Sequence, residues 1–242
     1  FLLADYRPLK QLTLFGNLDR FNDNVARNSA RNITDTLRAL IGLSFFSPQY
    51  PSLFMSVDMA DRKTRLDFPW PADNLTATLF SEVQYRYKDV NPYVRYRRVA
   101  YSDEIKKEAE YVQNVILIGL RKYIKPGTFV YIEGEADRKE YQDDETDSRI
   151  SGKAGFNYFY SPRFFCWAEA IYSKLKDRDE DSRRNKIEGS LGLSYELPWE
   201  SRLYTDIRYD KVLDPQRHEL ESQGLQFTIR LSKRFGWGRP EK

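Results

Sequence analysis

Like charges recur two residues apart in this chain, as with Arg95 and Arg97 and again with Glu133 and Glu135. In an extended strand, residues two apart point to the same face. The arginines could guide anions, and the carboxylates could contribute to a cation site, which would need further oxygen ligands from elsewhere. The open alternative is structural: Arg95 would form an ion pair with Glu82 or with Glu133.

Enzymatic chemistry has few candidates. The only histidine, His218, lies near Ser222 in a charged stretch that we expect to be a loop, where a serine–histidine pair would not be held in place. Cys166 is the only cysteine, which excludes an intramolecular disulfide and a Cys-rich metal site. No glycine-rich phosphate loop or nucleophile elbow is present. The sequence therefore predicts no enzyme, no cofactor and no metal site, and Cys166 is interpreted as a packing residue.

The charged residues lie in segments where polar and apolar residues alternate. From Leu225 to Phe235 every second residue is apolar, apart from Lys233, and the residues between are polar. Comparable alternation is found at 53–59, 75–85 and 187–197. A period of two predicts β-strands with one apolar and one polar face. Such segments follow one another from about Gln11 to Trp237, with no boundary between domains.

The connections between these segments alternate between short and long. Short turns are expected at Ser47–Pro51, Lys88–Asn91, Lys125–Gly127, Ser161–Arg163 and Pro198–Ser201. Long connections are expected near 20–33, 61–74, 102–109, 138–149, 176–186 and 211–222. Twelve segments joined in this way have both chain ends on the short-turn side. Connections sorted by length are typical of a transmembrane β-barrel with tight periplasmic turns and longer outer loops.

The composition agrees with a membrane barrel. The 242 residues include 17 Tyr and 15 Phe, which favour strands and membrane interfaces. The mean hydropathy is negative, as a barrel permits, since only alternate strand residues face lipid. A net charge of +3 gives no basic field for nucleic acid. The competing fold is a soluble β-sandwich or lipocalin-like barrel, but twelve closed strands enclose more space than an apolar interior fills.

We therefore predict an all-β fold for residues 1–242: a single 12-stranded antiparallel up-and-down β-barrel in a bacterial outer membrane, with both termini periplasmic. If the apolar face meets lipid, the polar face lines the lumen. The predicted pore-lining residues are Arg38, Glu82, Arg86, Arg95, Arg97, Arg121, Glu133, Glu135, Glu169, Glu188, Arg208 and Arg230. Most basic residues come from earlier strands than the carboxylates, so the predicted lumen has opposed basic and acidic walls.

Two functions are compatible with such a lumen. In the first, the protein is a channel or porin that passes polar or charged solutes, or a polymer. In the second, the same charges pair directly and plug the lumen. The barrel would then be a structural anchor in the outer membrane or a subunit of an envelope-spanning export complex.

Two segments resemble bacterial outer-membrane β-barrel proteins. Leu225–Trp237 resembles their closing strand, with alternating apolar residues and aromatics at Phe235 and Trp237, although Gly238–Lys242 follow here. Asn17–Pro51 resembles the first hairpin of β-barrel porins, with an Asp/Asn-rich loop before a strand. The resemblance implies contact with outer-membrane lipid and lipopolysaccharide, and insertion by the barrel-assembly machinery.

The start of the chain has no initiator Met, charged leader or apolar leader segment. We expect either a processed mature protein or the C-terminal part of a longer one. In the latter case, periplasmic or envelope-complex proteins are the expected partners.

Overall fold

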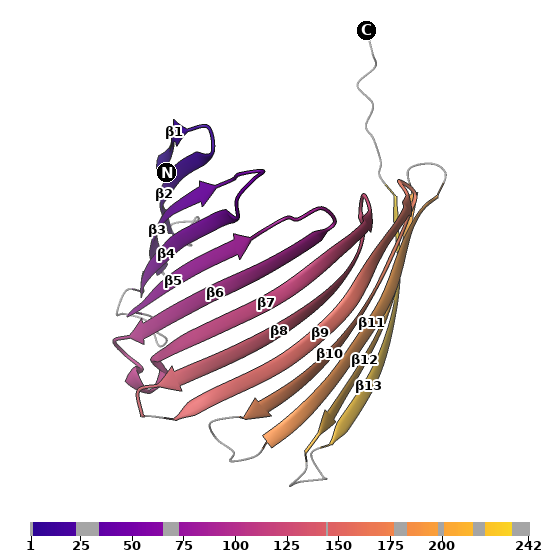
Figure 1. Ribbon diagram of the computed structural model, residues 1–242. Coiled ribbons are helices and arrows are strands. Elements are labelled where there is room, and N and C mark those ends of the chain that lie inside the picture. Colours follow the sequence, from indigo (N-terminus) through magenta and orange to yellow (C-terminus); the bar gives the residue numbers. More distant parts are fainter. Residues whose placement is uncertain are drawn as a thin grey trace.

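The computed structural model describes residues 2–22, 34–64, 73–143, 145–176, 183–197, 201–214 and 221–233, and the statements below refer to these. They form one antiparallel sheet of thirteen strands, each paired with the next along the chain (Figure 1). The strands are β1 (Leu2–Leu9), β2 (Leu12–Asn22), β3 (Thr34–Phe45), β4 (Ser52–Thr64), β5 (Asp73–Gln84), β6 (Val90–Asp103), β7 (Tyr111–Lys125), β8 (Thr128–Tyr141), β9 (Thr146–Ser161), β10 (Phe164–Lys176), β11 (Arg183–Leu197), β12 (Ser201–Leu213) and β13 (Ser222–Lys233). A 3-10 helix, η1 (Lys107–Ala109), follows β6. Among the described residues, no helix is long and apolar enough to cross a membrane.

The first strand, β1, is missing from the sequence prediction, which starts the strands at about Gln11. Asp5 and Pro8 interrupt a clear alternation here, and the pairing with β2 shifts register between Tyr6 and Leu9. Proline cannot donate a backbone hydrogen bond, so it is tolerated in an edge strand that pairs on one side only. β1 is such a strand.

The sheet is open, whereas the sequence predicts a closed barrel of twelve strands. β1 and β13 each pair with a single neighbour among the described strands. Because the sheet has thirteen antiparallel strands, β1 and β13 run in the same direction and cannot form an antiparallel pair. An antiparallel barrel would need an odd number of further strands. The odd count also places Leu2 and Lys233 at opposite ends of the strands, instead of both on the short-turn side.

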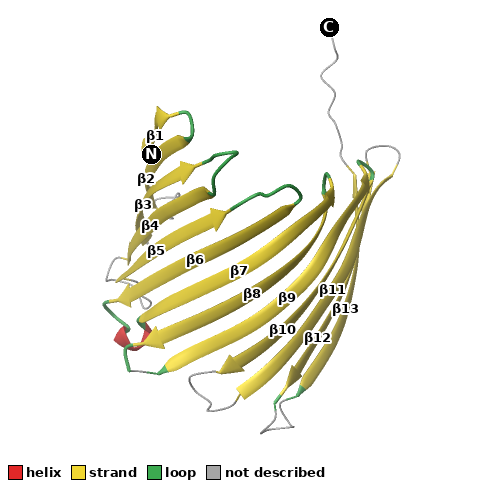
Figure 2. Cartoon of the chain, in the orientation of Figure 1, coloured by secondary structure: helices red, strands yellow, loops and turns green. Residues whose placement is uncertain are grey.

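The predicted short turns are confirmed at four of the five positions, and Lys10–Gln11 adds a further short turn between β1 and β2. The fifth prediction, Pro198–Ser201, lies almost entirely outside the described residues, although β11 ends at Leu197 and β12 begins at Ser201. The described short turns lie along the upper edge of the sheet in Figure 2. The long connection predicted at 138–149 is shorter, because β8 continues to Tyr141 and β9 begins at Thr146. Lys139 Nζ lies 3.9 Å from the ring centroid of Tyr111 and 4.6 Å from that of Tyr141. These cation–π contacts hold the charged strand end in the sheet.

The alternation gives the sheet two chemically different faces. On the apolar face the side chains of Ile41 and Leu225 are 70% and 75% exposed. On the polar face Tyr93 and Asp206 are only 4% and 3% exposed. A curved sheet brings side chains together on its concave side and separates them on its convex side. The polar face is therefore the concave, inner one, and the apolar face is the outer one.

Cys166 offers a test of this assignment, because it lies on the apolar face opposite Leu193 and Tyr158. If that face meets lipid, an apolar maleimide should label Cys166 in membranes several-fold faster than a charged maleimide does. The control is Cys166→Ala with Ser194→Cys, which moves the thiol to the polar face and should reverse the preference. Faster labelling of Cys166 by the charged reagent would exclude lipid contact at this face.

Candidate functional site

The candidate site is the polar face of the sheet, to which the pairing register assigns the predicted pore-lining residues. It places Arg38, Glu82, Arg95, Arg97, Arg121, Glu133, Glu135, Glu169, Glu188, Arg208 and Arg230 on this one face. Arg86 lies outside the strands, in the turn after β5, with its guanidinium 5.3 Å from the Tyr123 ring centroid.

The polar face is built around four aromatic residues that each lie over a glycine. The pairs are Phe15 on Gly42, Tyr93 on Gly119, Tyr131 on Gly155 and Trp167 on Gly192, each between directly opposed residues of adjacent strands. A Cβ added at any of these glycines would lie 2.1–2.6 Å from the aromatic side chain. Only the absence of a side chain lets the rings lie flat on the sheet.

By crossing the glycine, each aromatic residue contacts a side chain two strands away. Tyr93 on β6 donates a hydrogen bond to Glu133 on β8, and Tyr131 on β8 donates one to Glu169 on β10. Trp167 on β10 packs against Tyr204 on β12, with ring centroids 5.2 Å apart. Phe15 stacks on Phe54 of β4 at 5.7 Å. The aromatic–glycine pairs therefore tie together strands that do not pair directly.

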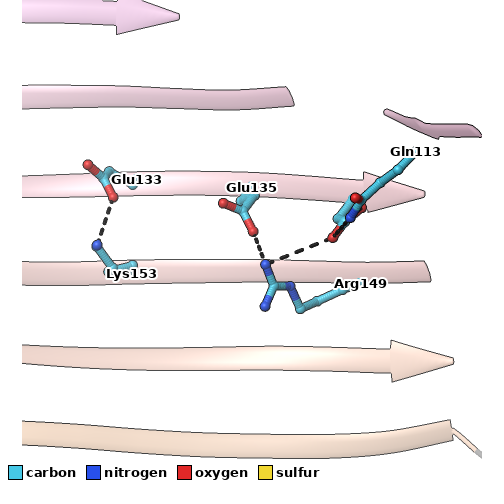
Figure 3. A network of polar contacts seen from close by, with 6 residues as sticks. Gln113, Glu133, Glu135, Arg149 and Lys153 are labelled. Atoms are coloured by element: carbon cyan, nitrogen blue, oxygen red, sulfur yellow. Dashed lines mark hydrogen bonds and ion pairs between the residues drawn. The ribbon is translucent and has the colours of Figure 1, made fainter. Parts of the chain in front are cut away.

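Lys153 joins two of these contacts into one network. Its Nζ lies 3.1 Å from Glu133 Oε2 and 3.1 Å from Glu169 Oε2 (Figure 3 shows the contact with Glu133). Together with Tyr93 and Tyr131, Lys153 thus forms a continuous chain of polar contacts from β6 to β10. Since the amine is shared by two carboxylates, it is the central group of the network.

A second group of polar contacts lies further along the same strands. Arg149 forms an ion pair with Glu135 (Figure 3). Arg149 Nη2 also lies 4.0 Å from Asp137 Oδ2. Gln113 Nε2 donates a hydrogen bond to Asp137 Oδ1 at 2.8 Å. The two carboxylates proposed as cation ligands, Glu133 and Glu135, are therefore each bound to a basic side chain of β9. No group of three or more metal-ligating side chains occurs in the described residues.

Other charges of the polar face also pair with close neighbours. Arg38 forms an ion pair with Asp58. Arg95 forms one with Glu82, which is one of the two structural partners that the sequence analysis offered for Arg95. In β12, Arg208 Nε lies 2.6 Å from Asp206 Oδ2. Basic and acidic residues are thus mixed along the wall, and the opposed basic and acidic walls that the sequence predicts are largely neutralised by neighbours.

A few charges on the polar face have no such neighbour. Arg97, Arg230 and Asp210 make no ion pair within the described part of the chain. The guanidinium of Arg121 lies 4.7 Å from the Phe129 ring centroid and 5.6 Å from that of Tyr93. Arg97, Arg230 and Asp210 are thus among the charges of the polar face that remain available to a solute.

The polar face is hollowed over β10–β13. A cavity of about 450 Å³ is lined there by Trp167, Glu188, Asp206, Arg208 and Asp210, among others. An indole beside several carboxylates and a guanidinium offers both an apolar surface and hydrogen-bonding groups. Sequence reasoning missed this recess because its residues come from four strands.

The aromatic–glycine pairs were also missed, although the sequence holds a signal for them. Gly42, Gly119, Gly155 and Gly192 all fall on polar-face positions inside strands, where an isolated glycine marks a close approach. The aromatic partner of each glycine depends on the strand register, which cannot be read from the sequence. Some predicted residues lie outside the described part of the chain: His218, Phe235 and Trp237.

Comparison with known proteins gives a fold but no family. No family model matches the chain, and no curated protein matches its sequence. A loop-deletion mutant of OmpT, an outer membrane protein of Vibrio cholerae, matches with a TM-score of 0.52 and 10% identity over 94% of this chain and 87% of that one. A bacterial polysaccharide outer membrane secretin matches with a TM-score of 0.53 and 11% identity over 95% and 74%.

An anion-selective porin from Comamonas acidovorans matches less well, with a TM-score of 0.49 and 9% identity over 87% of this chain and 77% of that chain. At such identities the likeness concerns the fold alone. The up-and-down antiparallel sheet described above resembles the β-barrels of these outer-membrane proteins, although it is open among the described strands.

Proposed function

We propose that the protein is an outer-membrane channel whose wall is the polar face, and that it passes polar or charged solutes or a polymer. The observation that carries this is the local nature of its ion pairs. Within the described residues, each ion pair joins side chains of the same strand or of adjacent strands. Such pairs stiffen a wall and leave the space in front of it free.

The alternative, a plugged barrel that anchors an envelope complex, is supported less well. A plug needs charges that meet across the lumen, and the described ion pairs do not do so. Two fold neighbours with TM-scores above 0.5 are an outer membrane protein and a polysaccharide outer membrane secretin. Both support an outer-membrane location. Insertion by the barrel-assembly machinery and any envelope partner belong to the proposal.

Among polymers, a polysaccharide suits the wall best. Sugar rings present apolar faces and many hydroxyl groups, which the cavity beside Trp167 can match with its indole, the carboxylates of Glu188 and Asp210 and the guanidinium of Arg208. The name of the secretin neighbour points in the same direction.

Single-channel recording of the full protein in planar bilayers tests the proposal. We expect discrete conductance steps whose ion selectivity depends on the unpaired charges of the wall. Arg97→Gln should shift selectivity toward cations, and Asp210→Asn should shift it toward anions, because local fixed charge sets the counter-ion concentration. Arg98→Gln is the matched control, since Arg98 follows Arg97 in β6 but lies on the apolar face.

Absence of conductance at all voltages in correctly folded protein would refute a channel. Conductance with selectivity that responds equally to Arg97→Gln and Arg98→Gln would instead refute the assignment of the polar face as the wall.

A further inference from the structure

The apolar face carries an unexpected row of basic residues. Strand pairing aligns Arg98 with Asn114, Asn114 with Arg138 and Arg138 with Ser148. It then aligns Ser148 with Lys176 and Lys176 with Arg183. We call Arg98, Arg138, Lys176 and Arg183, with Asn114 and Ser148 between them, the basic row; it crosses six adjacent strands, β6–β11. All four basic side chains are exposed.

The basic row marks one border of the apolar surface. From the row toward the short turns, β7 presents Ile116, Ile118 and Leu120 on this face. On β9 the face continues from Ser148 to Phe156, a rise of eight residues or about 27 Å measured along the tilted strand. This is enough for most of an apolar band about 25 Å tall. The row therefore lies where the apolar band ends, on the side of the long connections.

Charge compensation on this face differs between the two halves of the sheet. In the first half, Arg20 lies 3.5 Å from Asp35, and Lys63 lies 3.9 Å from Asp61. In the basic row only Arg138 has an acidic partner, Glu140, at 2.8 Å. Arg98, Lys176 and Arg183 make no ion pair within the described residues. The row is thus a band of positive charge at the border of an apolar surface.

The residues between the basic side chains also suit an anion. The amide of Asn114 accepts a hydrogen bond from the Tyr96 hydroxyl at 2.8 Å through its oxygen, which leaves its NH₂ group as a donor. The Ser148 hydroxyl can donate as well. Tyr96 lies on the same face, two residues from Arg98 in the direction of the short turns. Aromatic side chains are common at this level, where a membrane ends. Arginine and lysine with interleaved donors match phosphate oxygens.

We propose that the basic row binds the phosphates of lipopolysaccharide in the outer leaflet. The inference rests on the proposed channel insofar as the apolar face must meet lipid and the long connections must lie outside the cell. Neighbouring strands are about 4.8 Å apart, so Arg98, Arg138 and Lys176 follow one another at about 10 Å. A headgroup with more than one phosphate can bridge two such cations, whereas a phospholipid with one phosphate cannot.

Thermal unfolding of the detergent-solubilised protein, titrated with rough lipopolysaccharide, tests this proposal. The test variant is R98Q/R138Q/K176Q/R183Q, and the matched control is R20Q/K63Q, which removes basic residues of the same face that already have acidic partners. We expect lipopolysaccharide to raise the unfolding temperature of the wild type and of the control. In the test variant the apparent affinity should fall by about fivefold for each basic residue removed.

Phosphatidylglycerol and inorganic phosphate serve as comparison ligands. If either raises the unfolding temperature as much as lipopolysaccharide does, the assignment to lipopolysaccharide is wrong, and the row is a general anion surface. An unchanged response of the test variant would overturn the site itself. Should the quadruple variant not fold, R98Q/R138Q and K176Q/R183Q divide the row into halves, each with an expected partial loss.

Channel conductance is recorded on the same variants. The basic row lies on the face opposite to the wall, so its variants should conduct as the wild type does. Loss of lipopolysaccharide binding with normal conductance supports both proposals. Lipopolysaccharide binding by a protein that never conducts would refute the channel and leave the basic row standing.

Discussion

Gly119→Ala is expected to lower the free energy of unfolding by about 2 kcal/mol, a large effect for one added methyl group. Its Cβ would lie 2.4 Å from Tyr93 Cζ, well inside van der Waals contact. Tyr93 is almost fully buried, so the ring has little room to move. Any shift that relieves the clash also draws the Tyr93 hydroxyl away from Glu133, its hydrogen-bond acceptor two strands away.

The matched control is Gly134→Ala on the adjacent strand β8. Nothing lies within 4 Å of a Cβ at Gly134, so the methyl group meets open space on the apolar face. Replacing this glycine should leave stability unchanged or raise it by about 0.4–1 kcal/mol, because alanine restricts the unfolded chain. Urea unfolding of protein in lipid vesicles, followed by tryptophan fluorescence, compares the two variants.

A second comparison separates the steric clash from a general intolerance of substitution in β7. In a Tyr93→Leu background the ring is absent, and Gly119→Ala should then cost much less than in the wild type. Equal costs in both backgrounds would show that Tyr93 is not what excludes a side chain at residue 119. That result would also refute the same steric interpretation of the other three aromatic–glycine pairs.

The strands, their faces and the sorting of the connections could be predicted because each depends on local pattern. Alternation such as that of 225–235 reports which residues share a face, whatever the strand pairs with. Short turns at Lys125–Gly127 and Ser161–Arg163 are marked by turn residues. For the same reason, every predicted pore-lining residue inside a strand fell on one face.

Strand count and partners could not be predicted, since they depend on features that no local pattern carries. β1 is held as an edge strand by β2 despite Pro8, and this one added strand changes the parity of the sheet. Likewise, the pairing of Lys153 with both Glu133 and Glu169 requires the register of three strands at once. Apart from the Arg95–Glu82 alternative, local pattern also does not reveal which charges are neutralised by neighbours, because basic and acidic residues far apart in the chain meet only once the strands pair.

Lys153→Met should destabilise the sheet by about 2 kcal/mol or more. The side chain of Lys153 is 31% exposed, and its two partners Glu133 and Glu169 are 10% and 27% exposed. Removing the amine leaves two neighbouring carboxylates without their shared cation, and a partly buried charge left unpaired costs far more than the pair contributes. Partial exposure to lumen water keeps the expected value below that of a fully buried pair.

Two companion variants identify the cause. Lys153→Met combined with Glu133→Gln and Glu169→Gln removes the uncompensated charges, and it should recover most of the lost stability although it contains three substitutions. Arg138→Gln is the matched control for loss of one ion pair: its side chain and that of Glu140 are 66% and 46% exposed, and such pairs contribute about 0.2–1 kcal/mol. Denaturant unfolding in vesicles measures all of them. If the triple variant is less stable than Lys153→Met alone, shape and packing around the amine, and not charge compensation, hold β8–β10 together.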